Sequence, residues 1–250
     1  MKKIILKKTK LKVSKFCLGT NRINHLLPEY GSRIIKKAYK KGINFWDTSD
    51  DYNTHSHVAL ALRGLPREKI IIMTKITNVF GKKVKPHIKK MLKELGTNYI
   101  DILLLHAVDS EKELKKYLEI IPILKKIKAI RHIGLSSHKP NIINKIAENK
   151  DIEFILAPFN YRGFRIRGDY RDKTYLIRRK KMKESLIKCK KNKKDIFLIK
   201  IFANGLIKKI EKAIRYGLKQ KFSDGVNLGV SSAKELEEDI KLVNKILKEK

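Results

Sequence analysis

Three ionisable residues of the sequence each close an apolar, strand-like run. These residues are Asp47, Lys75 and His106, and they are separated by about one strand–helix unit each. Tyr52 follows Asp47 by five residues, in the polar segment beyond its strand. Because the carboxyl ends of neighbouring parallel strands meet at one face, we expect the four side chains to converge there.

Such a group could donate a proton to a substrate. The ordinary pKa of tyrosine is about 10, and a nearby ammonium favours the phenolate, so we expect Lys75 to lower the pKa of Tyr52. Asp47 would pair with Lys75 and offset its burial, and His106 would donate a hydrogen bond to a substrate oxygen. The site suits protonation of a carbonyl oxygen while a hydride reaches carbon. A nicotinamide or flavin must supply that hydride.

Each of these residues also has a structural explanation when taken alone. Asp47 could cap a helix with Thr48, and His106 could be a hydrogen-bonded histidine at a strand end. Tyr52 could simply pack in a loop, and one lysine in so basic a chain means little. Their common order and spacing favour a shared site.

The elements that would position the four residues alternate along the chain. Eight strand-like runs alternate with eight helical runs, roughly 25–30 residues per unit, which is typical of a (β/α)8 barrel. Residues 1–15 alternate apolar and basic side chains and predict a short N-terminal β-hairpin. We therefore predict the α/β class, with residues 1–250 forming a single (β/α)8 TIM barrel domain.

An open, doubly wound sheet is the alternative fold. No G-x-G-x-x-G motif follows the first strand, which argues against a Rossmann domain. Helices are predicted at 31–41, 111–128 and 206–218 among others, and Pro122 predicts a kink or a break in the second of these.

The chain is strongly basic, with 60 Lys and Arg against 25 Asp and Glu and a formal net charge of +35. A polyanion-binding protein is one explanation. The lysines are spread over all segments without the exposed aromatics that nucleic-acid binding uses, so we expect a solvated surface and no specific nucleic-acid partner. Segment 162–194 is crowded with Lys and Arg; we expect it either to form a solvated helix face or to attract an anionic ligand to the barrel mouth.

The two cysteines, Cys17 and Cys189, fit no metal or redox spacing, so we predict no metal site and a reducing, cytoplasmic location. The apolar run near the N-terminus is too short for a signal peptide. No apolar run approaches membrane-spanning length, so we expect no membrane partner.

The residues around the four side chains resemble those of the aldo-keto reductase family. Segment 42–52 resembles its signature of an aspartate, a threonine and a tyrosine, while 73–75 and 99–106 resemble its lysine and histidine strands. Further similar segments are 11–20, 133–138, 160–161 and 229–238.

This resemblance implies a barrel that reduces an aldehyde or ketone with NADP as its cofactor, or with NAD as the alternative. Tyr52 would be the general acid, tuned by Lys75 and Asp47, and His106 would orient the carbonyl. Ser136 and Ser137 would face the nicotinamide carboxamide, and loop 201–205 would span the pyrophosphate. The full set of implied cofactor-binding residues is Gly19, Thr20, Ser136, Ser137, Phe202, Ala203, Gly205, Ser231, Ser232 and Lys234.

Several positions depart from the family pattern. Ser137 stands where many members have Asn, Leu156 replaces a carboxamide-binding Gln, and Ile199 replaces a stacking aromatic. Ser231 aligns with an arginine for the 2′-phosphate, and Asp239 with an asparagine. The resemblance is to a short member without the long C-terminal loop or a C-terminal iron–sulfur cysteine cluster, which implies an open substrate site.

A small-molecule carbonyl compound is the expected partner. The alternatives are a dinucleotide-binding barrel with a sensor or regulatory role and little turnover, or a polyanion-binding basic protein. The sequence does not fix the substrate or the oligomeric state, for which a monomer is favoured.

Overall fold

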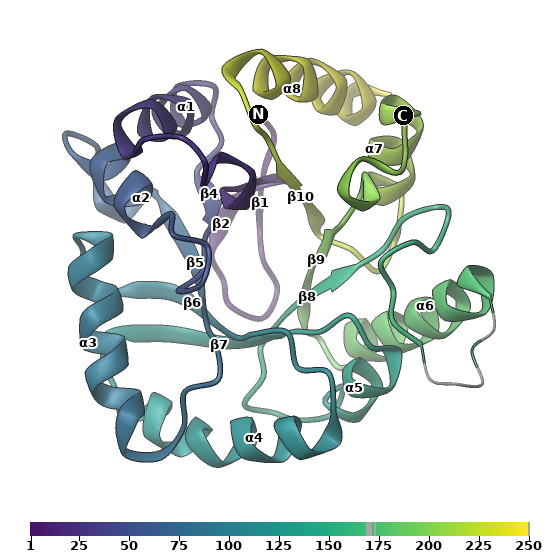
Figure 1. Ribbon diagram of the computed structural model, residues 1–250. Helices are drawn as coiled ribbons and strands as arrows, with labels where there is room; N and C mark the ends of the chain where they lie inside the picture. The colour runs from purple at the N-terminus through teal and green to yellow at the C-terminus, as the bar shows by residue number, and fades with distance from the viewer. Residues whose placement is uncertain (169–171, 173, 250) are drawn as a thin grey trace.

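The computed structural model describes residues 1–168, 172 and 174–249, so part of the basic segment 162–194 lies outside the described residues. Parallel strands close into a barrel in the order β10-β3-β4-β5-β6-β7-β8-β9 (Figure 1). The barrel strands are β3 (Phe16–Gly19), β4 (Phe45–Asp47), β5 (Ile71–Ile76), β6 (Ile100–Leu105), β7 (Ile130–Ser136), β8 (Phe154–Pro158), β9 (Asp195–Ile199) and β10 (Gly225–Gly229). The predicted (β/α)8 barrel is confirmed.

Helices surround the barrel on its outside (Figure 1). They are α1 (Pro28–Lys40), α2 (His55–Leu62), α3 (Val84–Leu95), α4 (Glu111–Lys125), α5 (Pro140–Lys145), α6 (Tyr175–Lys191), α7 (Ile210–Leu218) and α8 (Ala233–Lys248). Their apolar faces pack on the outer side of the strands in one continuous core. No helix in the described part of the chain is long and apolar enough to span a membrane.

Two helices differ from their predicted form. Helix α4 continues through Pro122, so the break expected there is absent. Helix α7 begins at Ile210 instead of Leu206, because a 3-10 turn at 203–205 with left-handed backbone comes before it. This irregular turn lies at the barrel mouth, where it bears on the site.

The predicted N-terminal hairpin is confirmed as β1 (Lys3–Ile5) paired antiparallel with β2 (Lys12–Ser14). Leu6 and Val13 pack with the side chains that fill the barrel interior. The carboxylate of Asp195, at the start of β9, accepts hydrogen bonds from the backbone N–H groups of Lys8 and Thr9 at 3.0 and 2.8 Å. The hairpin therefore covers the amino end of the barrel and leaves the carboxyl end for a ligand.

Cys17 and Cys189 are both buried free thiols. Burial raises the pKa of each thiol, so both remain protonated and unreactive at neutral pH. The cytoplasmic location stays a prediction.

Candidate active site

A buried ion pair joins β4 to β5 at the carboxyl end of the barrel. The Lys75 Nζ lies 2.5 Å from Asp47 Oδ1 and 2.6 Å from the carbonyl oxygen of Thr48. Residues Asp47 and Met73 are paired in the sheet, so Lys75, two residues further along β5, points to the same face. Burial lowers the pKa of Lys75, but the charges and hydrogen bonds of Asp47 and Tyr52 outweigh it, and the pKa lies above its ordinary value.

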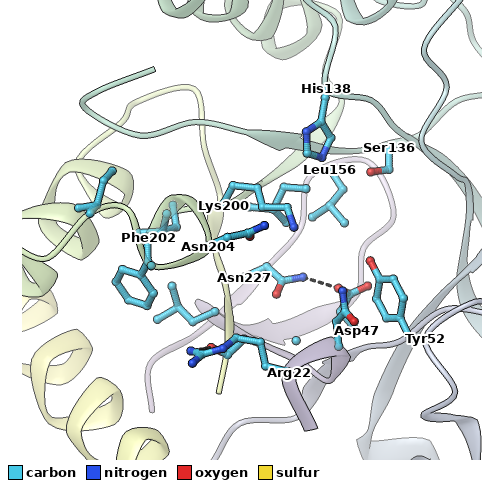
Figure 2. Close-up of a pocket in the computed structure, with 18 of the residues that line it drawn as sticks. Arg22, Asp47, Tyr52, Ser136, His138, Leu156, Lys200, Phe202, Asn204 and Asn227 are labelled. Atoms are coloured by element: carbon cyan, nitrogen blue, oxygen red, sulfur yellow. Dashed lines mark hydrogen bonds between the residues drawn. The ribbon is translucent and has the colours of Figure 1, made fainter. Parts of the chain in front are cut away.

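Asn227 on β10 binds the second carboxylate oxygen of Asp47. Its Nδ2 donates to Asp47 Oδ2 at 2.7 Å (Figure 2). Gly19 makes this contact possible, because a Cβ at that position would lie 2.6 Å from Asn227 Oδ1. Sequence reasoning missed Asn227, although an amide within an otherwise apolar strand was a visible signal.

Tyr52 lies over this ion pair. The Lys75 Nζ is 4.3 Å from the centroid of the Tyr52 ring, and the ring meets that of His106 edge to face, with centroids 5.7 Å apart. Burial raises the pKa of Tyr52; the Lys75 charge opposes this, and the net pKa lies above its ordinary value. The expected lowering is wrong in its net direction, because loss of solvent around the phenol outweighs the attraction of the ammonium.

His106 is oriented through its Nδ1. This nitrogen lies 2.9 Å from Thr77 Oγ1 and 3.3 Å from Asp51 Oδ2. The Thr77 hydroxyl donates its single hydrogen to Asp50 Oδ1 at 2.6 Å, so Nδ1 of His106 must donate to Thr77. The Nε2 of a neutral ring is then an acceptor, and the ring can donate from Nε2 only when both nitrogens are protonated.

Asp51 supplies the negative charge next to this ring. Burial raises the pKa of Asp51, but hydrogen bonds from His106 and Ser49 outweigh it and lower the pKa to about 2. Asp50, Asp51 and His106 offer ligand atoms within 4.8 Å of one another, which is close enough for a cation. Since Asp50 already accepts from Thr77 and pairs with His87 at 2.8 Å, internal bonds account for this cluster.

A cavity of about 740 Å³ opens above these residues and runs to the ends of β9 and β10 (Figure 2). Many of the residues predicted for the site line it, whereas Lys75, which is bonded to Asp47, is fully buried and does not. The predicted residues in its wall are Gly19, Asp47, Tyr52, His106, Ser136, Phe202 and Gly205. Leu156 and Ile199, which depart from the family pattern, also line it.

The other predicted cofactor-binding residues do not line the cavity. Thr20 and Ser137 are fully buried, and their hydroxyls donate to the carbonyl oxygens of Asp47 and Val108 at 2.9 and 2.6 Å. Ala203, in the loop after β9, is fully buried. Ser231, Ser232 and Lys234 lie at the start of α8, where Ser232 caps the helix through the N–H of Glu235.

The loop after β9 holds an unusual backbone. Lys200, Ala203 and Asn204 have φ values of 56°, 51° and 59°, and Gly205 follows with 86°. Asn160 secures the loop by donating from Nδ2 to the Lys200 carbonyl at 3.0 Å. Non-glycine residues with left-handed backbone are costly and cluster at ligand sites, so this loop is a candidate ligand-binding segment.

The far end of the cavity carries paired charges that the sequence did not reveal. Arg22, from the turn after β3, forms an ion pair with Glu235 and donates to the carbonyl of Gly229 at 3.1 Å. Glu235 Oε2 also accepts from the backbone N–H and hydroxyl of Ser231, at 2.8 and 2.6 Å. Burial raises the pKa of Glu235, but these bonds lower it overall.

Comparison with known proteins agrees with this geometry. The family model of the aldo/keto reductase family matches residues 15–209. The chain belongs to the aldo/keto reductase family. This match takes in the four predicted catalytic residues and the loop after β9.

Several aldo/keto reductase relatives are similar to parts of the chain. "Probable aldo-keto reductase 1" of Glycine max is 33% identical over 145 residues, which cover 52% of this chain and 42% of the relative. The NADH-specific methylglyoxal reductase of Escherichia coli (strain K12) is 26% identical over 193 residues, covering 64% of this chain and 59% of the relative. The chain thus spans about half the length of these curated relatives.

The solved holo form of aldo-keto reductase AKR11C1 from Bacillus halodurans shares the fold. Its TM-score with this chain is 0.79 at 23% identity, over 97% of this chain and 91% of that one.

The cavity suits a nicotinamide dinucleotide. Its volume of about 740 Å³ lies within the range of about 300–1,000 Å³ typical of ligand sites. Gly19 and Gly229, at the ends of β3 and β10, and Gly205, in the loop after β9, line it without side chains, which leaves their backbone open to a ligand. Its wall also carries hydrogen-bonding groups along its length, from Ser136 near Tyr52 to Glu235 at the far end.

Proposed function

We propose that this aldo/keto reductase reduces a small aldehyde or ketone to an alcohol with NADH or NADPH. The observation that carries the proposal is the Lys75 ammonium, held at 2.5 Å by Asp47 and lying 4.3 Å from the Tyr52 ring. A phenol so placed can donate its proton to a carbonyl oxygen and leave its negative charge beside an ammonium. When bound, the nicotinamide supplies the hydride.

Each side chain has one task in this scheme. Tyr52 is a neutral phenol at neutral pH, since its pKa is raised, and it therefore holds the proton to be given. Lys75 stabilises the phenolate that remains, and Asp47 with Asn227 fixes Lys75 in place. His106 donates from Nε2 to the carbonyl oxygen when its ring is doubly protonated. The proton lost by Tyr52 is regained from solvent through the open cavity.

A small 2-oxoaldehyde is the first substrate to test. The relative from Escherichia coli is named as a methylglyoxal reductase, and a small ligand needs few contacts in an open cavity. Purified protein should oxidise NADH or NADPH when methylglyoxal or another small aldehyde is added, as followed by absorbance of the reduced dinucleotide. Tight dinucleotide binding without turnover on any carbonyl compound would contradict the proposal and favour the sensor role.

Asp51 should support this reduction through its contact with His106. Asp51→Asn removes the carboxylate that lies 3.3 Å from Nδ1 of His106, so the ring is held less firmly toward the carbonyl oxygen and kcat/KM should fall about tenfold. Steady-state kinetics of both proteins measure this.

The control for that substitution is Asp151→Asn, which removes the same charge from the loop before β8, at the amino end of the barrel. It should leave kcat/KM unchanged. An unchanged kcat/KM of Asp51→Asn would show that Asp51 does not act through His106.

We further propose that the adenosine end favours a ribose without a 2′-phosphate. The Arg22 guanidinium and the Ser231 donors already bind the Glu235 carboxylate. A carboxylate accepts hydrogen bonds from a ribose diol and repels a phosphate. This proposal departs from the sequence-based expectation of NADP.

Glu235→Gln should therefore shift dinucleotide choice toward NADPH. The amide releases Arg22 and removes the repulsion, so the ratio of the NADPH to NADH dissociation constants should fall about tenfold. Fluorescence titration without substrate measures both constants. Glu237→Gln, at a partly exposed position on α8 paired with Lys37, is the matched control. An unchanged ratio would place the ribose elsewhere.

A further inference from the structure

Lys200 places a second ammonium in the cavity, apart from that of Lys75. It follows the last residue of β9 and lines the cavity wall, where Figure 2 draws it among the pocket side chains between His138 and Asn227. Its side chain is half-buried, and its backbone adopts the left-handed region at φ 56°. Nothing in the proposed reduction uses it.

This ammonium has no counter-ion among the described residues. No carboxylate there lies within 4.0 Å of its Nζ, and Asp47, whose charge reaches it, is already bonded to Lys75 and Asn227. Arg165, Lys75 and Arg167 add like charge. Arg167 has its own partner in Asp109.

The surroundings oppose a charge at Lys200. Burial, followed by the charges of Arg165 and Lys75, lowers the pKa of its ammonium. His138, which also lines the cavity, does not act as a counter-ion. Burial lowers its pKa to about 4, so its ring is neutral at neutral pH. Its Nδ1 donates to the Arg165 carbonyl at 2.8 Å. A half-buried, unpaired cation on a left-handed residue is costly, and such costs are typical of ligand sites.

We propose that Lys200 binds an anionic oxygen group of a ligand in this cavity. Two ligands could bring that group: a carbonyl substrate that also bears a carboxylate, or the dinucleotide through its pyrophosphate. The inference rests on the proposed function, because both are ligands of the reductase site. Asp47, Tyr52 and Lys200 line the same cavity, so the bound anion would share that cavity with the reacting groups.

The test compares Lys200→Met with Lys150→Met. Both substitutions remove one positive charge, but Lys150 is exposed in the loop before β8, at the amino end of the barrel. The first arm titrates NADH and NADPH into each protein by fluorescence. The second arm titrates glyoxylate, a carbonyl compound with a carboxylate, and uncharged methylglyoxal into each protein saturated with the oxidised dinucleotide, by calorimetry.

Loss of a charge-assisted hydrogen bond should weaken binding roughly tenfold to a hundredfold. Weaker NADH and NADPH binding in Lys200→Met alone identifies the pyrophosphate as the anion. Weaker glyoxylate binding with unchanged methylglyoxal binding identifies a substrate carboxylate. Lys200→Arg should retain most of the affinity in either case. Affinities of Lys200→Met that stay within about twofold of the unsubstituted protein in both arms overturn the proposal.

The result for Lys200 does not depend on whether the protein reduces carbonyl compounds. All constants are measured without turnover, so an inactive protein would contradict the reductase and leave the Lys200 result readable. Thermal unfolding followed by circular dichroism checks that each variant is folded. Should Lys200→Met fail to fold, Lys200→Gln, which keeps a polar end, takes its place in both arms.

Discussion

Tyr52→Phe is expected to lower kcat for carbonyl reduction by about 10²–10⁴-fold, the contribution typical of a positioned general acid. The phenyl ring keeps its place beside His106 and over Lys75, so dinucleotide binding should stay within about twofold. Single-turnover absorbance traces and fluorescence titrations separate these two effects. The raised pKa of Tyr52 keeps its phenol protonated across the neutral pH range, so loss of that proton should not limit the activity there.

Tyr175→Phe is the matched control for this substitution. Tyr175 is half-exposed at the start of α6 and is no part of the cavity wall, so removing its hydroxyl should leave kcat unchanged. Turnover by Tyr52→Phe at the rate of the control protein would show that another group donates the proton.

Lys75→Met is expected to lower both activity and stability. It leaves the Asp47 carboxylate buried at 4% exposure without its ammonium, which should reduce the free energy of unfolding by about 3–5 kcal/mol. It also removes the charge that stabilises the Tyr52 phenolate, so kcat should fall about 10²-fold or more. Urea unfolding and steady-state kinetics measure the two effects.

The double substitution Lys75→Met with Asp47→Asn separates these losses. Removing both charges together should recover most of the stability, because no unpaired ion remains buried. The catalytic loss should persist, since the phenolate still lacks its cation. Recovery of activity along with stability would mean that Lys75 acts only by holding the fold.

The sequence indicated the barrel and the core of the site for one physical reason. Parallel strands of a closed barrel end at the same face, so Asp47, Lys75 and His106 could be placed together from their positions at strand ends alone. Alternating apolar and basic residues before the first barrel strand likewise sufficed to predict the hairpin.

Features that depend on contacts between distant segments escaped the sequence. Asn227 reaches Asp47 across Gly19, and Arg22 meets Glu235 only because β10 pairs with β3 to close the barrel. The Ser137 hydroxyl donates to the backbone carbonyl of Val108, and no sequence motif reveals that contact.

The net pKa of Tyr52 could not be predicted from the presence of a lysine. Burial raises that pKa and the Lys75 charge lowers it, and the balance depends on how much solvent the folded chain removes from the phenol. The start of α7 was also missed, because the left-handed backbone at Ala203 and Asn204 runs against the ordinary preference of these residues.

The transfer of deuterium from a dinucleotide labelled at C4 of the nicotinamide tests the central claim most directly. The protein is incubated with labelled NADH or NADPH, of either C4 stereochemistry, and a panel of small aldehydes and ketones, and the products are analysed by NMR. An alcohol with one deuterium on the former carbonyl carbon is predicted, formed by the unsubstituted protein and nearly absent with Tyr52→Phe. A protein that binds the dinucleotide and yields no deuterated alcohol from any of these compounds would contradict the account.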